Sequence, residues 1–336
     1  MSKLLSEAVD DFVAYRRVAF SPNTAKAADQ GMRKFLLVIG NVQVRSLGPE
    51  HGERFQSWLI SRGYKPNSVN NYMSVLATFS TWATARRYLP PSAGLTATVR
   101  VIATPAPPRL RIPAREMGRV LDACPRPDIR MMVALGFYLF LRASEMTNLK
   151  VGDVDLASGE VQVYVQKGKR YDRMPICWEL DQELRSWLTI YATDVERNLL
   201  PGDYLVPSHR PTGWWDADRT TRCWRPSKPM CQPTRHIHAV LQACGYETRN
   251  QDGSSKREGM HTLRRSGARA YYDEMIATGS VRDDVLPQVM AMLHHRSVAV
   301  TEHYLGLEAD REKRDLRLKG KRMFSSHDAN VIQMAK

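Results

Sequence analysis

The chain has 336 residues, of which 43% are hydrophobic and 25% charged, a composition typical of a soluble globular protein with room for two domains. A formal net charge of +14 and a pI of about 9.7 indicate a polyanionic partner. Nucleic acid is the first candidate, and a membrane surface is the alternative. No apolar run is long enough to cross a bilayer, and the first residues lack a signal-peptide core, which argues against a membrane-spanning or secreted protein.

The cysteines and histidines give no pattern typical of metal binding. Five cysteines are an odd number for a disulfide framework, and their spacings match no common zinc site. His236 and His238 lie close to Cys231, but this spacing is also unlike that of a usual site. We therefore expect reduced thiols in the cytoplasm, and neither a metal nor another cofactor.

Residues 1–100 carry the signals of an all-helical domain. Ser21 followed by a proline predicts a helix start, and Gly40 predicts the end of that helix. A second helix is expected over residues 49–61, ahead of Gly63, and a third begins near Asn67.

The third of these helices has two different faces. Its apolar side chains fall on one face at helical spacing: Val69, Tyr72, Met73, Leu76 and Phe79. The opposite face is polar and is either a solvated surface or a surface that lies against DNA. Nearby basic residues favour the second interpretation and are predicted to bind DNA: Arg62, Lys65, Arg86 and Arg87.

Four prolines within residues 101–113 predict a linker between two domains, because proline removes backbone donors and restricts the chain. Arg109 and Arg111 place positive charge along this segment and are predicted to contact DNA. Residues 114–306 then form the second domain.

The second domain mixes helical and strand patterns, so the chain as a whole is expected to be mainly α with a small β-sheet. Helices are expected over residues 114–122, 130–148, 179–193, 232–244, 262–276, 285–293 and 297–304. Residues 160–165 alternate with period two, and a basic turn, KGKRYD, follows, which together predict a β-hairpin. Residues 198–259 are rich in Pro, Trp, Arg and Gly, and long loops are expected around the one helix placed there.

One set of polar residues in this domain suits attack on a phosphodiester. A tyrosine can act as the nucleophile, the non-bridging oxygens need fixed donors, and the leaving 5′-oxygen needs a proton. Arginine binds phosphate through paired hydrogen bonds, histidine moves protons near neutral pH, and lysine acts as a charge or an acid. The chain supplies Arg142, Lys167, His261, Arg264 and His295, and then Tyr304 nine residues after that histidine.

Each of these residues also has an ordinary structural interpretation. Arg142 and Glu145, three residues apart, could form only a helix ion pair worth about 0.3–0.5 kcal/mol. The lysine turn could be a solvated hairpin tip, and Tyr304 could be a half-buried tyrosine. The order and spacing of the whole set favour catalysis, with Tyr304 as the nucleophile.

In this order and spacing, the residues resemble the tyrosine recombinases, the phage-integrase type of site-specific DNA recombinase. The resemblance rests on LGFYLFLRASEM, which holds Arg142 and, at the family's acidic supporting position, Glu145. It also rests on the hairpin segment QKGKRYDRMPI, which holds Lys167. It continues with HTLRRSGA, then LHH, then the tyrosine. The resemblance is strong over residues 114–304 and weaker over residues 1–100, which resemble the family's core-binding domain.

The resemblance implies a reaction and a set of partners. The protein would clamp duplex DNA at attachment sites, attack the scissile phosphate through Tyr304, and leave a 3′-phosphotyrosine and a free 5′-hydroxyl. Exchange of two strand pairs through a Holliday junction would need a homotetramer on two paired sites and no cofactor. The expected location is the cytoplasm of a bacterial host.

The chain departs from the family pattern at several positions. His294 stands where glycine is usual, Arg265 where histidine is common, and Gln166 where glycine precedes the lysine. Lys169 and Arg170 lie close enough to leave the choice of the catalytic lysine open, and both are predicted to bind DNA.

Residues 307–336 are basic and helical in character, and form either a solvated helix or, as we predict, a tail that docks on a neighbouring subunit. The chain begins almost directly at the core-binding-like domain, which indicates a compact recombinase without an arm-binding domain. Phage or mobile-element integration is favoured over an Xer-like role in resolving chromosome dimers. A type IB topoisomerase-like enzyme, a regulator that has lost catalysis and a membrane-surface protein are the remaining alternatives.

Overall fold

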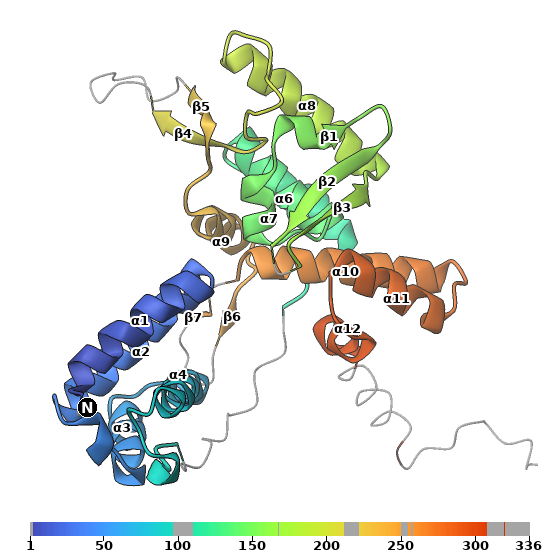
Figure 1. The fold of residues 1–336 in the computed structure, drawn as a ribbon. Helices are drawn as coiled ribbons and strands as arrows, with labels where there is room; N and C mark the ends of the chain where they lie inside the picture. Colours follow the sequence, from blue (N-terminus) through green and yellow to red (C-terminus); the bar gives the residue numbers. More distant parts are fainter. Residues whose placement is uncertain are drawn as a thin grey trace, which may run out of the picture. The chain divides into compact units, whose positions relative to one another are not determined.

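The computed structural model describes residues 3–96, 110–166, 168–211, 222–249, 255–256, 258–307 and 319 (Figure 1). The chain divides into two compact units, Met1–Ala106 and Pro107–Lys336. Both units are built mainly from helices, and the second also carries small antiparallel sheets, which confirms the predicted fold class. Most of the predicted tail, and the predicted linker up to residue 109, lie outside the described residues.

The first unit is helical, as predicted. Its elements are α1 (Leu5–Ala19), α2 (Pro22–Ile39), η1 (Val44–Ser46), α3 (Pro49–Ser61), α4 (Pro66–Ala85) and η2 (Pro91–Ala93). The Ser21 hydroxyl accepts a hydrogen bond from the Thr24 backbone N–H at 3.3 Å and so caps α2. This helix ends at Gly40, where φ is 88°. The predicted helix boundaries in this unit are therefore confirmed.

Aromatic side chains fill the core of the first unit. Phe12 of α1 contacts Phe79 and Trp82 of α4, with ring centroids 5.5 and 5.3 Å apart. Phe35 of α2 contacts Phe55 of α3 at 5.3 Å. The apolar face predicted for α4 packs in this core, which leaves much of its polar face at the surface.

The second unit is organised around two packed helices, α6 and α10. Its helices in chain order are η3 (Ala114–Glu116), α5 (Met117–Asp122), α6 (Pro127–Tyr138), α7 (Ala143–Asn148), η4 (Val151–Asp153), α8 (Trp178–Asp194), α9 (Pro233–Ala243), α10 (Met260–Ala277), α11 (Arg282–Met292) and α12 (Val298–Leu305). Most residues of α6 are buried, and α10 lies against it (Figure 1). Gly267 of α10 allows the close approach, because a Cβ atom there would lie 1.8 Å from the Phe137 carbonyl oxygen.

The last part of the predicted linker is attached to α10. The Ile112 backbone N–H donates to the Ser266 hydroxyl at 2.8 Å. The Arg265 guanidinium donates two hydrogen bonds to the Leu110 carbonyl, at 3.2 and 2.6 Å. Residues 110–112 are therefore part of the second unit, and the basic residue that stands in place of the family's histidine holds them there.

The single helix predicted over residues 130–148 is wrong. Helix α6 ends at Tyr138, and a turn in which Phe140 adopts φ 53° separates it from α7. The Phe140 side chain is buried in a hydrophobic cluster shared with α10 and α11, so packing stabilises this left-handed residue. Arg142 is consequently the N-cap residue of α7 and does not lie within a long helix.

The predicted hairpin is confirmed. Strands β1 (Val154–Asp155), β2 (Glu160–Val165) and β3 (Arg170–Pro175) form an antiparallel sheet in the order β1-β2-β3. The three valines of β2 are buried, and the two residues between them are exposed. Lys167, predicted for the turn between β2 and β3, lies outside the described residues.

Residues 198–259 contain more regular structure than predicted. Two antiparallel pairs occur there: β4 (Pro207–Pro211) with β5 (Arg222–Pro229), and β6 (Thr248–Arg249) with β7 (Ser255–Lys256). Trp224 of β5 is buried, and its indole N–H donates to Asp194 of α8 at 2.8 Å. Sequence reasoning missed these strands because their prolines and basic residues hide the alternation of a half-buried strand.

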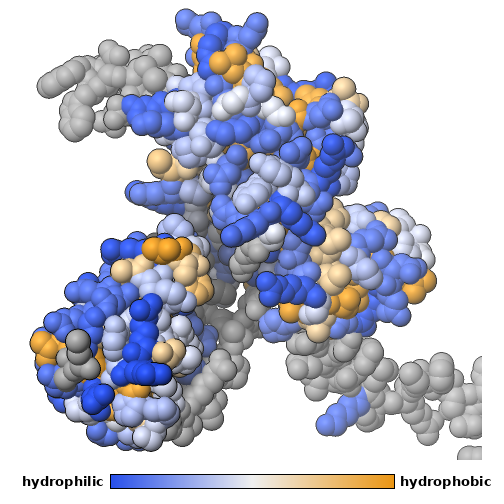
Figure 2. All heavy atoms as spheres, viewed as in Figure 1, coloured by the Kyte–Doolittle hydropathy of each residue, from blue (hydrophilic) through white to orange (hydrophobic). Residues whose placement is uncertain are grey.

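The visible surface of each unit is mostly hydrophilic, with scattered hydrophobic side chains (Figure 2). In the part of the chain that the structure describes, no helix combines the length and apolar character needed to cross a bilayer. Within those same residues, no three His, Cys, Asp or Glu side chains gather in a way that could hold a metal ion.

Candidate active site

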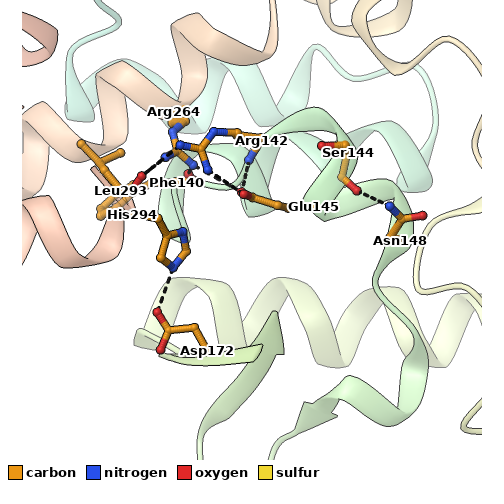
Figure 3. A network of polar contacts seen from close by, with 9 residues as sticks. All are labelled: Phe140, Arg142, Ser144, Glu145, Asn148, Asp172, Arg264, Leu293 and His294. Carbon is orange, nitrogen blue, oxygen red and sulfur yellow. Dashed lines mark hydrogen bonds and ion pairs between the residues drawn. The ribbon is translucent and has the colours of Figure 1, made fainter. Parts of the chain in front are cut away.

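Two arginines and one carboxylate form the centre of the candidate site (Figure 3). Arg142 donates to the Glu145 carboxylate through its backbone N–H at 2.8 Å and through its guanidinium at 2.7 Å. Arg264, near the start of α10, contacts the same carboxylate at 3.5 Å. Because Glu145 is only 3% exposed, one buried anion holds together two guanidinium groups from distant parts of the chain.

Backbone carbonyl groups complete the positions of the arginines. The Leu293 carbonyl accepts hydrogen bonds from both guanidinium groups, and the Phe140 carbonyl accepts a further one from Arg264. Arg264 is 1% exposed, and burial, with the nearby charge of Arg142, lowers its pKa to about 10. Arg264 therefore stays charged at pH 7, in an orientation that its partners fix.

A turn between α11 and α12 carries two adjacent histidines. His294 has φ 50°, a left-handed conformation that glycine adopts most readily, which accounts for glycine at this position in the pattern that the sequence resembles. The His294 Nε2 atom lies 2.8 Å from the Asp172 carboxylate of β3. The His295 Nδ1 atom lies 3.1 Å from the Thr301 hydroxyl of α12. Each histidine is thus held by a different element.

Tyr304 lies on α12, close to this turn. Its ring packs edge-on against the His295 imidazole, with centroids 5.1 Å apart, and its hydroxyl lies 3.4 Å from the His261 carbonyl oxygen. Burial raises the pKa of Tyr304, whereas the positive charges of three arginines, led by Arg264, act in the opposite direction. The neutral phenol is therefore the favoured form at pH 7, and a base must take its proton during any attack.

The structure brings most of the predicted catalytic residues to one place. The side chains that meet there, with the supporting carboxylate, are Arg142, Glu145, Arg264, His295 and Tyr304. His261 is exposed on the first turn of α10, and its backbone carbonyl faces the tyrosine hydroxyl. Lys167 lies outside the described residues, although β2 and β3 on either side of it are described.

The predicted DNA-binding residues lie in different surroundings. Six of them are exposed: Arg62, Lys65, Arg86, Arg87, Lys169 and Arg170. Arg111 donates a hydrogen bond to the Gly306 carbonyl at 3.2 Å, just after α12. Arg109 lies outside the described residues. The six exposed side chains can reach a phosphate backbone. Arg111, in contrast, holds the main chain just after α12, the helix that carries Tyr304.

Sequence reasoning missed two kinds of contribution to this site. The carbonyl groups of Phe140 and Leu293 position the arginines, and backbone acceptors leave no signal in residue types. Thr301 and Asp172 hold the two histidines of the turn. Thr301 could have been found from its place between the histidine and the tyrosine, but no local pattern singles out Asp172.

Solved structures share this fold. The chain is similar to a lambda integrase dimer bound to a COC' core site, with a TM-score of 0.67, 15% sequence identity, and coverage of 90% of this chain and 77% of that one. It is also similar to the Tn1549 transposon integrase in complex with transposon right end DNA, with a TM-score of 0.64, 12% identity, and coverage of 94% and 100%. These likenesses define the fold as that of an integrase-type protein.

Residues 111–311 match the Phage integrase family, and the chain belongs to that family. It is 26% identical over 201 residues to the Tyrosine recombinase XerD of Pseudomonas putida, and 28% identical over 197 residues to the Tyrosine recombinase XerA of Thermococcus kodakarensis. These matches cover 55% and 57% of this chain and 64% of the length of each relative. The family predicted from the motifs is confirmed.

Proposed function

We propose that this protein is a site-specific DNA recombinase that cleaves and rejoins DNA strands through Tyr304. The tyrosine oxygen attacks the scissile phosphorus, the phenolic proton passes to a base, the P–O5′ bond breaks, and the departing 5′-oxygen takes up a proton. The resulting 3′-phosphotyrosine retains the energy of the phosphodiester. Attack by the 5′-hydroxyl of a second strand then rejoins the DNA without a nucleotide energy source.

The observation that carries this proposal is the charge balance of the arginine cluster. Two guanidinium groups share one carboxylate, so Arg142, Arg264 and Glu145 together carry one net positive charge. The Arg142 side chain is 21% exposed, and both arginines act electrostatically on the Tyr304 hydroxyl. A phosphodiester carries the single negative charge that complements this cluster, and guanidinium forks match its two non-bridging oxygens.

The remaining groups of the site suit proton transfer. His295 lies against the Tyr304 ring, where an imidazole can exchange a proton with the phenol or donate to the phosphate. His261 lies in the first turn of α10, the helix that carries Arg264, and is proposed to donate to the phosphate. Lys167, which the sequence places between β2 and β3, is proposed to protonate the leaving 5′-oxygen.

Exchange of two strand pairs requires two paired DNA sites and four active tyrosines. A structural neighbour of this chain is a lambda integrase tetramer bound to a Holliday junction. We therefore propose a homotetramer on two attachment sites in the cytoplasm of a bacterial host, with residues 307–336 docking on a neighbouring subunit. Integration and excision of a phage or mobile element are favoured over chromosome-dimer resolution by the long segment at residues 198–259.

Mapping of the covalent adduct on native flanking DNA tests this function. Nicked duplexes that span the flanking DNA release a short fragment after cleavage and so trap the protein on the strand. An adduct at one discrete position supports the proposal, and its absence from every duplex overturns it. Relaxation of a supercoiled plasmid with one site, without exchange between paired sites, would instead identify a topoisomerase-like enzyme.

Replacement of Thr301 by valine is expected to slow strand cleavage about tenfold. The Thr301 hydroxyl donates to the Ser297 carbonyl at 3.3 Å, so its oxygen accepts from His295 Nδ1 and leaves Nε2 as the basic nitrogen. Valine keeps the shape but removes this acceptor, and a misoriented acid–base group loses part of a contribution of about 10²–10⁴. Single-turnover cleavage measures the effect. Thr301→Ser is the control, and equal rates for the valine and serine variants would contradict the role.

DNA binding is expected to depend steeply on salt. A protein with about six phosphate contacts loses about 10³-fold in affinity between about 50 and 200 mM salt, because each contact releases counterions. Lys65→Ala is expected to lower the slope of log affinity against log salt by about one, since the side chain is exposed beside α4. Arg185→Ala, which removes an exposed side chain paired with Asp181, is the matched control. Fluorescence anisotropy measures both slopes, and a slope near zero for the unaltered chain rules out the proposed contacts.

A further inference from the structure

We propose that His294 and Asp172 form a latch that positions the β2–β3 hairpin, and with it the lysine turn, against the arginine cluster. This inference rests on the proposed function. The latch belongs to this chain's own sequence, because the family pattern has glycine at the position of His294, and glycine has no side chain to reach the hairpin.

The geometry of His294 supports a specific contact. Its side chain is 4% exposed, and its Nε2 atom lies 2.8 Å from the Asp172 carboxylate (Figure 3). The Nδ1 atom is buried and has no hydrogen-bond partner among the described residues. Burial lowers the pKa of His294, although Asp172 and Glu145 act to raise it and Arg264 adds to the lowering. The neutral ring therefore carries its proton on Nε2 and donates it to Asp172.

Backbone strain also points to a role for this side chain. His294 occupies the left-handed region at φ 50°, which is rare for residues other than glycine. A histidine adopts this conformation less readily than a glycine, so a contact of its side chain compensates for part of the cost. The bond to Asp172 is the contact that the described residues supply.

Asp172 is well placed to hold the hairpin. It pairs with Val163, two positions before β2 ends, and Lys167 is the second residue after β2 in the sequence. The neighbouring residues of β3 on both sides, Tyr171 and Arg173, are exposed. The Asp172 carboxylate also accepts from the Arg173 backbone N–H at 3.0 Å, which orients it. The hydrogen bond at this position therefore connects β3, at the edge of the sheet, to the turn between α11 and α12.

The other end of the latch lies at the centre of the site. His294 directly follows Leu293, whose carbonyl accepts from Arg142 and Arg264, and directly precedes His295. His294, which contacts the hairpin, thus lies between Leu293, which binds both arginines, and His295, which contacts Tyr304. We assign His294 as a positioning residue: it holds the donor of the leaving-group proton in register with the phosphate.

The test compares two substrates at the mapped cleavage site. One nicked duplex has the natural 5′-oxygen at the scissile phosphate, and the other has a 5′-bridging sulfur, which leaves as a thiolate and needs no proton from an acid. His294→Gly, which suits the backbone conformation, and Asp172→Ala remove the latch from either side. Glu160→Ala removes an exposed ion pair with Arg173 on the same sheet and is the matched control.

We expect each latch variant to cleave the oxygen substrate about tenfold more slowly, a fraction of the contribution of a general acid. On the sulfur substrate each variant should match the unaltered chain, and the double variant should be no slower than either single one. Glu160→Ala should be unchanged on both substrates. Asp172→Asn, whose amide oxygen can still accept from Nε2, should retain most of the rate. If Asp172→Ala does not fold, His294→Gly alone removes the latch and is compared with Asp172→Asn.

Three outcomes overturn the latch: unchanged rates in His294→Gly, equal losses on both substrates, or losses that multiply in the double variant. In each of them the unaltered chain still cleaves, so the proposed function stands and the latch alone fails. Absence of cleavage of either substrate by the unaltered chain overturns both the latch and the proposed function.

Discussion

Tyr304→Phe is expected to form no covalent adduct with a nicked suicide duplex, while it still binds the same DNA. The variant loses only the hydroxyl that attacks phosphorus, and its ring can keep the edge-on contact with His295. The loss in cleavage rate should be at least about 10⁴-fold, as for removal of other catalytic nucleophiles. Denaturing electrophoresis of labelled DNA after protease treatment measures the adduct.

Tyr271→Phe is the matched control for this experiment. The Tyr271 hydroxyl donates to Gln288 at 3.0 Å, and the ring lies in the same hydrophobic cluster as Tyr304. The control should form the adduct at the normal rate. An adduct that survives in Tyr304→Phe and disappears in Tyr271→Phe would show that Tyr271 of α10 is the nucleophile, and this result would overturn the mechanism.

Glu145→Ala is expected to destabilise the second unit and to remove most of the cleavage activity. The carboxylate is buried and is shared by Arg142 and Arg264, so its loss leaves two guanidinium groups uncompensated. Loss of one partner from a buried ion pair costs about 3–5 kcal/mol in the free energy of unfolding. Cleavage by the folded fraction should fall by about 10²–10³, because the donors to the phosphate lose their orientation.

Chemical denaturation and single-turnover cleavage separate the two effects of Glu145→Ala. Asp181→Ala removes an exposed helix ion pair with Arg185 and should cost less than about 1 kcal/mol. Glu145→Gln keeps the shape and a hydrogen-bond acceptor, so it should be less destabilised than the alanine variant. An alanine variant as stable as Asp181→Ala would show that the cluster does not depend on this carboxylate.

The sequence predicted those parts of the molecule that depend on local chemistry. Ser21 and Gly40 cap the two ends of helix α2, and the sequence shows them because capping residues act within one turn. The hairpin follows from the period-two alternation of β2, and the site residues follow from motifs whose spacing a single helix or turn preserves.

The parts that the sequence did not predict depend on distant contacts. The segment around Phe140 is apolar on all sides, so its periodicity gives no sign of the break between α6 and α7. The break is stabilised by a cluster with α10 and α11, which lie more than a hundred residues later. The hydrogen bond between His294 and Asp172 joins residues with a similar separation in the sequence, and no local sequence pattern near either residue predicts it.

The shared acceptor at Leu293 has a consequence for how this site can change. Its carbonyl binds both arginines, yet the group belongs to the main chain and is present whatever amino acid occupies the position. Random mutagenesis and evolutionary drift can therefore replace the leucine side chain, but they cannot remove the carbonyl oxygen of residue 293. Only a change in backbone chemistry, such as an ester in place of the 293–294 amide, weakens this acceptor directly. This part of the arrangement that orients the arginines is thus invisible to conventional genetics.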